Sequence, residues 1–381
     1  MLVLSHASYL TLTVTRAMLP QPTDIAQPTD IENWFMANGA SPTRRALTAD
    51  DVERYLAASF DPPPRVVDCA PLDGGWFAAV WSAELADGRS VVLKVGPPPQ
   101  VPVLRYERGM IAAEAGFLRL VAAHAPQVPV PAVLHHGVDP DAGDWLVTVR
   151  LPGHNLPALA ESADPPDDSA VRHDLGVAYA ALHRITGGRF GYDGGRAAAA
   201  TWAAAFTAMV EELLADAADW SVRLPASPDR FRSLLARHAG LLDTVRRPAL
   251  LHWDGWDGNV LAASDLDGVL RMTGLVDGER YLFGDPLMDL VAPLLFRRAE
   301  QEPEHPFLRG YRAAAGDAAV DLDDDRVRHR LALYRMHLYL VMLVEMPSRH
   351  LTGPEHQGQV ELLTGLLNEE LAALSSAGTT P

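Results

Sequence analysis

The stretch from Leu250 to Leu261 places polar side chains that can do acid–base chemistry and bind cations between two apolar pairs. It reads Leu-Leu-His-Trp-Asp-Gly-Trp-Asp-Gly-Asn-Val-Leu. A second unit of this kind presents Asp277 at the end of an apolar run, about 18 residues after Asn259. This pattern predicts a divalent-cation site, because Mg²⁺ prefers hard oxygen ligands and needs only one or two from the protein when phosphates and waters supply the rest.

The spacing of His252, Asp254 and Asn259 matches the catalytic loop of the eukaryotic-type kinase superfamily, in which the asparagine follows the aspartate by five residues. The segment 284–290, Gly-Asp-Pro-Leu-Met-Asp-Leu, resembles the one that follows in aminoglycoside phosphotransferases and related small-molecule kinases. The resemblance covers roughly residues 65–300. It implies an α+β, two-lobed protein-kinase-like fold with a small antiparallel-sheet first lobe and a larger helical second lobe.

The resemblance also implies a role for each polar residue of these loops. Asp254 would accept or orient the proton of an acceptor hydroxyl, while Asn259 and Asp277 would hold Mg²⁺ on ATP or GTP. Three further residues would support the site structurally, namely His252, Asp285 and Asp289. The implied activity is transfer of the γ-phosphate to a hydroxyl of a small molecule.

Upstream, Lys94 at the end of Val91-Val92-Leu93-Lys94 resembles the phosphate-binding lysine of the family. It is the only lysine among 32 basic residues, and the planar fork of an arginine does not reproduce its compact charge. Glu114 resembles its helix partner, with Glu107 as an alternative two helical turns earlier. The remaining nucleotide-binding residues implied are Gly74 and Gly75 of the glycine loop and Val149 and Leu151 of the hinge.

The sequence departs from the family pattern in three places. The glycine loop, Asp-Gly-Gly at 73–75, is shorter than a full G-x-G-x-x-G, although two glycines still permit a tight turn beside a phosphate. Trp253 and Gly255 flank Asp254 where relatives usually carry Gly and Leu, and Trp256-Asp-Gly-Asn resembles fructosamine-kinase-like members. The segment Asp277-Gly278-Glu279 lacks the phenylalanine of the protein-kinase motif Asp-Phe-Gly, which argues against a protein kinase.

Hydrophobic periodicity predicts the elements that position these residues. A capped helix is expected after Thr48, followed by strands near 66–67, 77–81 and 90–95, a hairpin turn at Asp87-Gly88, a helix at 105–123 and strands at 128–133 and 145–151. Helices are expected near 169–185, 199–219, 228–245, 324–346 and 358–375, with short strands between 249 and 283.

These elements predict three regions. Residues 1–45 are expected to be an extension, in loop or partly disordered form, because they carry a proline-containing tandem duplication, Gln-Pro-Thr-Asp-Ile. Residues 46–150 are expected to form the nucleotide-binding first lobe. Residues 151–381 are expected to form the helical second lobe, with the catalytic loop, the metal loop and the acceptor site.

The composition of the 381-residue chain narrows its partners and its compartment. Its net charge of −17 disfavours nucleic acid and anionic membranes as partners. The single cysteine, Cys69, permits no intrachain disulfide, which fits a reducing cytoplasm. No apolar run reaches the roughly 18 residues of a membrane helix, and the first residues lack the pattern of a signal peptide. The oligomeric state is not indicated.

The acidic second lobe favours a cationic acceptor, such as an aminoglycoside or another basic antibiotic, with antibiotic resistance as the biological role. The acids considered for contact with it are Glu161, Asp164, Asp167, Asp168, Glu345 and Glu355. Three alternatives remain open. They are a kinase of ketosamines or amino alcohols, a non-catalytic nucleotide-binding regulator, and a metal-independent sugar-binding protein with Trp253 and Trp256 as stacking platforms.

Overall fold

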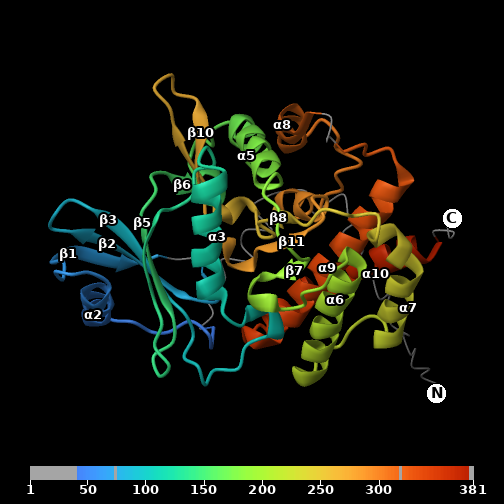
Figure 1. Cartoon of the computed structure of the whole chain (residues 1–381), viewed down its shortest axis with the longest axis horizontal. Coiled ribbons are helices and arrows are strands. Elements are labelled where there is room, and N and C mark those ends of the chain that lie inside the picture. The colour runs from blue at the N-terminus through green and yellow to red at the C-terminus, as the bar shows by residue number, and fades with distance from the viewer. Residues whose placement is uncertain (1–40, 73–74, 317–319, 377–381) are drawn as a thin grey trace, which may run out of the picture.

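The computed structural model describes residues 41–72, 75–316 and 320–376. An antiparallel sheet with two flanking helices forms the first part of the chain, and a larger, mostly helical assembly forms the rest, so the predicted fold class is confirmed (Figure 1). Residues 1–40 of the expected extension lie outside the described residues. Residues 41–45 form a turn, and the hydroxyl of Thr43 donates to the carbonyl of Trp76 at 2.9 Å.

The sheet of the first part has the strand order β1-β2-β3-β5-β4, and all neighbouring strands are antiparallel. Its elements are α2 (Ala49–Ser59), β1 (Val66–Pro71), β2 (Ala79–Leu85), β3 (Ser90–Val95), α3 (Met110–His124), β4 (Val133–Gly137) and β5 (Trp145–Val149). Thr48 begins α2 with a capping box, as expected. The hairpin between β2 and β3 turns at Gly88, whose φ of +87° favours glycine.

Side chains alternate along β3, and this alternation decides which face of the sheet carries the lysine. Val91, Leu93 and Val95 are buried in a cluster with α2. Lys94 therefore points to the opposite face, where α3 lies between the sheet and the helical part (Figure 1).

Two local expectations in this part were wrong. The strand expected at 128–133 starts only at Val133, because Pro129 and Pro131 have no backbone N–H to donate to a ladder. The helix expected from 105 starts at Met110, after a short 3₁₀ turn (η2, Arg105–Glu107) and Gly109 at a φ of +72°.

Within the described residues, the helical part contains two helices that periodicity did not predict, α4 and α8. Its helices are α4 (Leu156–Ala160), α5 (Ser169–Leu182), α6 (Trp202–Asp219), α7 (Pro228–Leu242), α8 (Pro306–Ala315), α9 (Asp325–Ser348) and α10 (Gln357–Ser376). Its strands are β6 (His154–Asn155), β7 (Gly191–Tyr192), β8 (Ala249–Leu251), β9 (Val260–Ser264), β10 (Leu270–Leu275) and β11 (Leu282–Gly284). They form two small sheets, β10-β9-β6 and β7-β11-β8. No helix among the described residues is long and apolar enough to cross a membrane.

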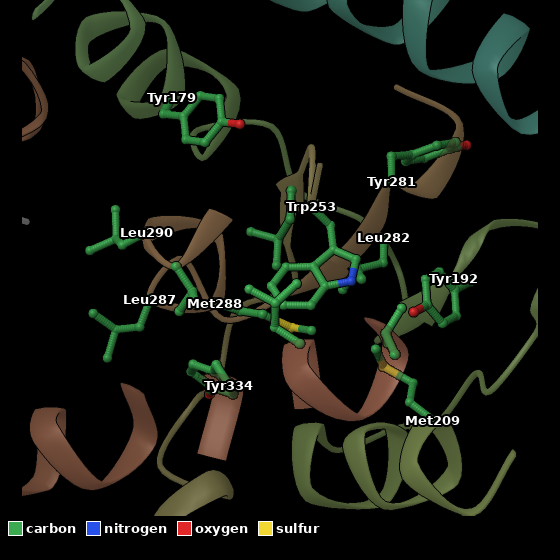
Figure 2. Packing of buried hydrophobic residues seen from close by; sticks show 14 of the residues in the cluster. Tyr179, Tyr192, Met209, Trp253, Tyr281, Leu282, Leu287, Met288, Leu290 and Tyr334 are labelled. Atoms are coloured by element: carbon green, nitrogen blue, oxygen red, sulfur yellow. The ribbon is translucent and has the colours of Figure 1, made fainter. Parts of the chain in front are cut away.

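The hydrophobic core lies directly beneath the loop that joins β8 to β9. Figure 2 shows the indole of Trp253 within this core, near Leu282 and Met288, and only 2% of Trp253 is exposed. A ring buried in this way has no open face for a sugar. Trp253 is therefore a core residue that anchors the loop, which excludes it as a stacking platform.

Candidate active site

Three charged side chains from different elements meet between the sheet and the helical part. Nζ of Lys94 on β3 donates to both carboxylate oxygens of Glu114 on α3, at 2.7 and 2.8 Å, and to Oδ1 of Asp277. Burial alone lowers the pKa of Lys94, but the carboxylates of Asp277 and Glu114 outweigh it, so the pKa lies above its ordinary value. Lys94 is thus a fixed positive charge. The alternative partner, Glu107, pairs with Arg349 instead.

Asp254 and Asn259 face each other across the loop between β8 and β9. Nδ2 of Asn259 donates to the backbone carbonyl of Asp254 at 2.7 Å and lies 3.3 Å from its Oδ2. The 3₁₀ turn at Asp257–Asn259 folds the asparagine back onto the aspartate. The backbone carbonyl of Asn259 also accepts from N–H of Val276 at 3.0 Å, which ties this loop to the segment that carries Asp277.

Two buried side chains hold the loop in place from below. Asp289 accepts from the backbone N–H groups of His252 and Trp253 at 2.9 and 2.7 Å, and it is fully buried. Nδ1 of His252 accepts from N–H of Asp254 at 3.2 Å, and its Nε2 donates to the carbonyl of Val276 at 3.0 Å. Burial lowers the pKa of His252, which keeps the ring neutral with these two roles. Between His252 and Asp254 the backbone turns at Trp253, which has a φ of +63°.

Asp285 has a different role from the one expected. Its carboxylate accepts from Arg330 at 2.7 Å and from the hydroxyl of Tyr334 at 2.6 Å, and both residues are on α9. It therefore fixes the segment after β11 to helix α9. Within the described part of the chain its side chain bonds to α9 and to N–H of Leu287, and not to the loop at 252–259.

One pocket is lined by five of the residues predicted to be catalytic, nucleotide-binding or metal-binding. Gly75, Lys94, Asp254, Asn259 and Asp277 all line it. Glu114 is held at its edge through the bond to Lys94.

The remaining nucleotide-binding candidates are not part of this pocket wall. Gly74 lies outside the described residues. Val149, at the end of β5, is 37% exposed, and neither it nor Leu151 lines the pocket.

Two residues of the site were missed by the sequence analysis, and both follow Asp277 in the 3₁₀ turn Gly278–Arg280. Glu279 lines the pocket, and burial raises its pKa to about 8. Arg280 places Nε 3.6 Å from Oδ2 of Asp254 and Nη2 2.9 Å from Oε1 of Glu345. Their position next to Asp277 was the only signal in the sequence.

Of the acids considered for contact with an acceptor, Glu345 alone lines the pocket. Its carboxylate accepts from the hydroxyl of Tyr106 and pairs with Arg280. Burial raises the pKa of Glu345 to about 7. The others lie outside the pocket. Glu161, Asp164, Asp167 and Glu355 are exposed, and Asp168 is half-buried and pairs with Arg172.

The donor set suits a cation that is shared with a ligand. The described residues contain no group of three or more His, Cys, Asp or Glu side chains able to hold a metal ion by themselves. Asn259 and Asp277 offer one amide oxygen and one carboxylate, because Nδ2 of Asn259 is already engaged by Asp254. That set fits Mg²⁺, which binds through one or two protein oxygens plus phosphates.

The fold and this arrangement define a kinase-like phosphotransferase. The model of the phosphotransferase enzyme family matches residues 68–334, and the chain belongs to this family. No curated protein matches the chain.

Solved structures share the fold. A protein from Thermobifida fusca assigned as a fructosamine-3-kinase is 21% identical over 87% of this chain and 100% of its own, with a TM-score of 0.60. Aminoglycoside phosphotransferase APH(4)-Ia, solved with AMP-PNP and hygromycin B, is 18% identical over 86% of this chain and 99% of its own, with a TM-score of 0.56. A kanamycin and GDP complex of an APH(2") enzyme is 17% identical over 84% and 98%, with a TM-score of 0.51.

Proposed function

We propose that the protein transfers the γ-phosphate of ATP or GTP to a hydroxyl group of a small molecule. The observation that carries this proposal is that Lys94, Asp254, Asn259 and Asp277 line a single pocket although they are spread over 184 residues of the chain. Membership of the phosphotransferase family supports it, as do the nucleotides bound by the structural neighbours. The lone cysteine fits a reaction in the cytoplasm.

Each residue has a task that follows from its contacts. Lys94, held by Glu114, presents a positive charge to the phosphates, and Gly75 of the glycine loop lies beside them. Asn259 and Asp277 would hold Mg²⁺, and the bound cation would supply positive charge to the phosphates. Asp254 accepts or orients the proton of the acceptor hydroxyl, because it is the carboxylate beside the open pocket that Asn259 and the loop keep in place.

The supporting residues act through the loop. Asp289 and His252 fix the backbone on which Asp254 sits, so they are positioning residues. Val149 and Leu151 are given no contact with the nucleotide in this proposal, because neither lines the pocket. Basic antibiotics, ketosamines and amino alcohols are the acceptors that the sequence favours.

The proposal is tested by a panel of acceptors supplied with Mg·ATP or Mg·GTP, with release of nucleoside diphosphate and phosphate on the product as readouts. In Asp254→Ala we expect turnover to fall at least about a hundredfold while the melting temperature and nucleotide binding persist. Asp267→Ala, an exposed aspartate in the β9–β10 turn, is the matched control. Nucleotide binding without transfer to any acceptor would favour a regulator instead.

A further inference from the structure

The pocket continues past Asp254 along one face of α9. Leu338, Met342, Glu345, Met346 and Arg349 all line it. They are spaced by three or four residues, or by multiples of such steps, so they share one side of the helix. Three of these five side chains are apolar.

The rest of this end of the pocket is also mainly apolar. It is completed by Trp256 of the catalytic loop, by the segment after the 3₁₀ turn at residues 288–290, and by the start of α10 and the turn before it. The lining residues there are Ala292, Leu295, Leu351, Gln359 and Leu363. We use the name apolar wall for the apolar residues that line this end of the pocket, namely Trp256, Ala292, Leu295, Leu338, Met342, Met346, Leu351 and Leu363.

The charged side chains beside the apolar wall are paired within the protein. Glu345 pairs with Arg280 and accepts from Tyr106. Arg349 pairs with the buried Glu107, and its guanidinium lies 5.7 Å from the ring centroid of Phe77. Both charged side chains on this face of α9, Glu345 and Arg349, therefore already have partners within the protein.

The apolar lining and the paired charges of the pocket decide which acceptor binds more strongly than the net charge of −17 does. The field of distant surface carboxylates is screened within about 8–10 Å in physiological salt, so it steers ligands without selecting them. A polyamine in the pocket would lose its hydration against apolar side chains and would compete with Arg280 for Glu345.

We propose that the apolar wall binds the apolar body of a neutral alcohol and directs its hydroxyl to Asp254. This inference rests on the proposed phosphotransferase function and names its substrate class. That class differs from the cationic acceptors that the composition favours. Met342 is the specificity-determining residue that we select, because it is half-buried in the middle of the wall.

The test compares binding of neutral alcohols, cyclohexylmethanol and naphthylmethanol, with binding of kanamycin and hygromycin B. Calorimetry is run on the full chain with Mg·AMP-PNP at low and high salt. We expect naphthylmethanol to bind more tightly than cyclohexylmethanol and than either aminoglycoside. Its binding should show a negative heat-capacity change and little salt dependence. Met342→Asp should weaken naphthylmethanol binding at least about tenfold. The control Leu266→Asp, at a fully exposed turn residue, should leave it unchanged.

Met342→Gln is a milder variant that should also weaken naphthylmethanol binding. Melting temperatures show whether each variant is folded. Tighter, salt-dependent binding of kanamycin or hygromycin B overturns the inference, as does naphthylmethanol binding that both Met342 variants leave intact. Phosphate transfer is measured separately. Naphthylmethanol binding as expected with no transfer to any alcohol would remove the proposed function and leave the apolar wall assigned. Phosphate transfer to kanamycin or hygromycin B alone would support the proposed function and overturn the assignment of the apolar wall.

Discussion

The hydroxyl of Tyr179 fills the space into which a side chain at position 255 would project. A Cβ added to Gly255 would lie 1.6 Å from this oxygen and 2.7 Å from the ring carbon that carries it. Tyr179 is fully buried on α5. The helix therefore sets the path of the chain immediately after Asp254, and a glycine at 255 is a packing requirement of this loop.

We expect Gly255→Ala to displace the loop and to lower turnover at least about tenfold, with a loss of about 1–3 kcal/mol in the free energy of unfolding. Adding Tyr179→Phe should restore part of both losses, because it removes the closest atom. Gly240→Ala is the matched control, since a Cβ there meets nothing within 4 Å. Kinetics and urea unfolding measure the effects. Equal behaviour of the single and double variants would contradict this account.

Asp277 is expected to couple nucleotide binding to magnesium. In Asp277→Ala, the Mg²⁺ concentration needed for half-maximal nucleotide binding should rise about tenfold or more, because the cation loses a carboxylate ligand. Titrations of Mg²⁺ at fixed AMP-PNP measure it. The variant also removes one partner of Lys94, so nucleotide binding without Mg²⁺ is measured alongside. Superimposable Mg²⁺ curves would remove Asp277 from the metal site.

Asp289 should affect catalysis through the loop without touching the reactants. Asp289→Ala leaves two buried N–H groups, those of His252 and Trp253, without their acceptor. We expect a loss of about 2–4 kcal/mol in the free energy of unfolding, and a fall in kcat with little change in the KM for nucleotide. Asp289→Asn, which keeps one acceptor oxygen, should recover part of kcat. A rise in KM with kcat intact would point to a binding role instead.

His337 predicts how stability changes with pH. It is fully buried on α9, its two ring nitrogens have no hydrogen-bond partner within the described part of the chain, and burial lowers its pKa from 6.5 to about 3. Below pH 6.5 the unfolded chain takes up a proton at this ring that the folded chain does not. The contribution of neutral His337 to the free energy of unfolding is therefore fully present above pH 6.5. It is lost as pH falls toward 3, at about 1.4 kcal/mol per pH unit.

His337→Phe should flatten this slope, since a phenyl ring does not titrate. Urea unfolding at neutral and mildly acidic pH measures the difference, and His124→Gln, at an exposed histidine, is the control. Parallel slopes in the wild type and His337→Phe would show that other groups govern acid sensitivity.

Local signals in the sequence predicted most of the fold that positions the site. The alternation of residues 90–95 correctly predicted β3, and the Thr48 cap correctly predicted the start of α2. The spacing of Asp254, Asn259 and Asp277 predicted that they share a site, and all three line one pocket in the structure. These features depend on near neighbours in the chain, so their pattern is visible in a single sequence.

Features that depend on distant contacts were not predictable in this way. Arg280 meets Glu345, and Tyr106 reaches the same carboxylate across 239 positions. Trp253 stands in a polar loop, and only the packing around it shows that it is a core residue. The acidic surface indicated a cationic ligand, whereas the pocket wall is set by a few apolar residues on α9 and α10.

The 3₁₀ turn η2, just before α3, is joined to the helical part by ion pairs, and α3 itself shares a hydrophobic core with that part. Arg105 pairs with Asp216 and Asp219 on α6, and Glu107 pairs with Arg349. One continuous hydrophobic cluster also includes Phe117 of α3 and the helices beyond it. Neither part can lose its packing without exposing apolar surface of the other. Heat should therefore unfold sheet and helices in a single cooperative transition, with one calorimetric peak for the whole molecule.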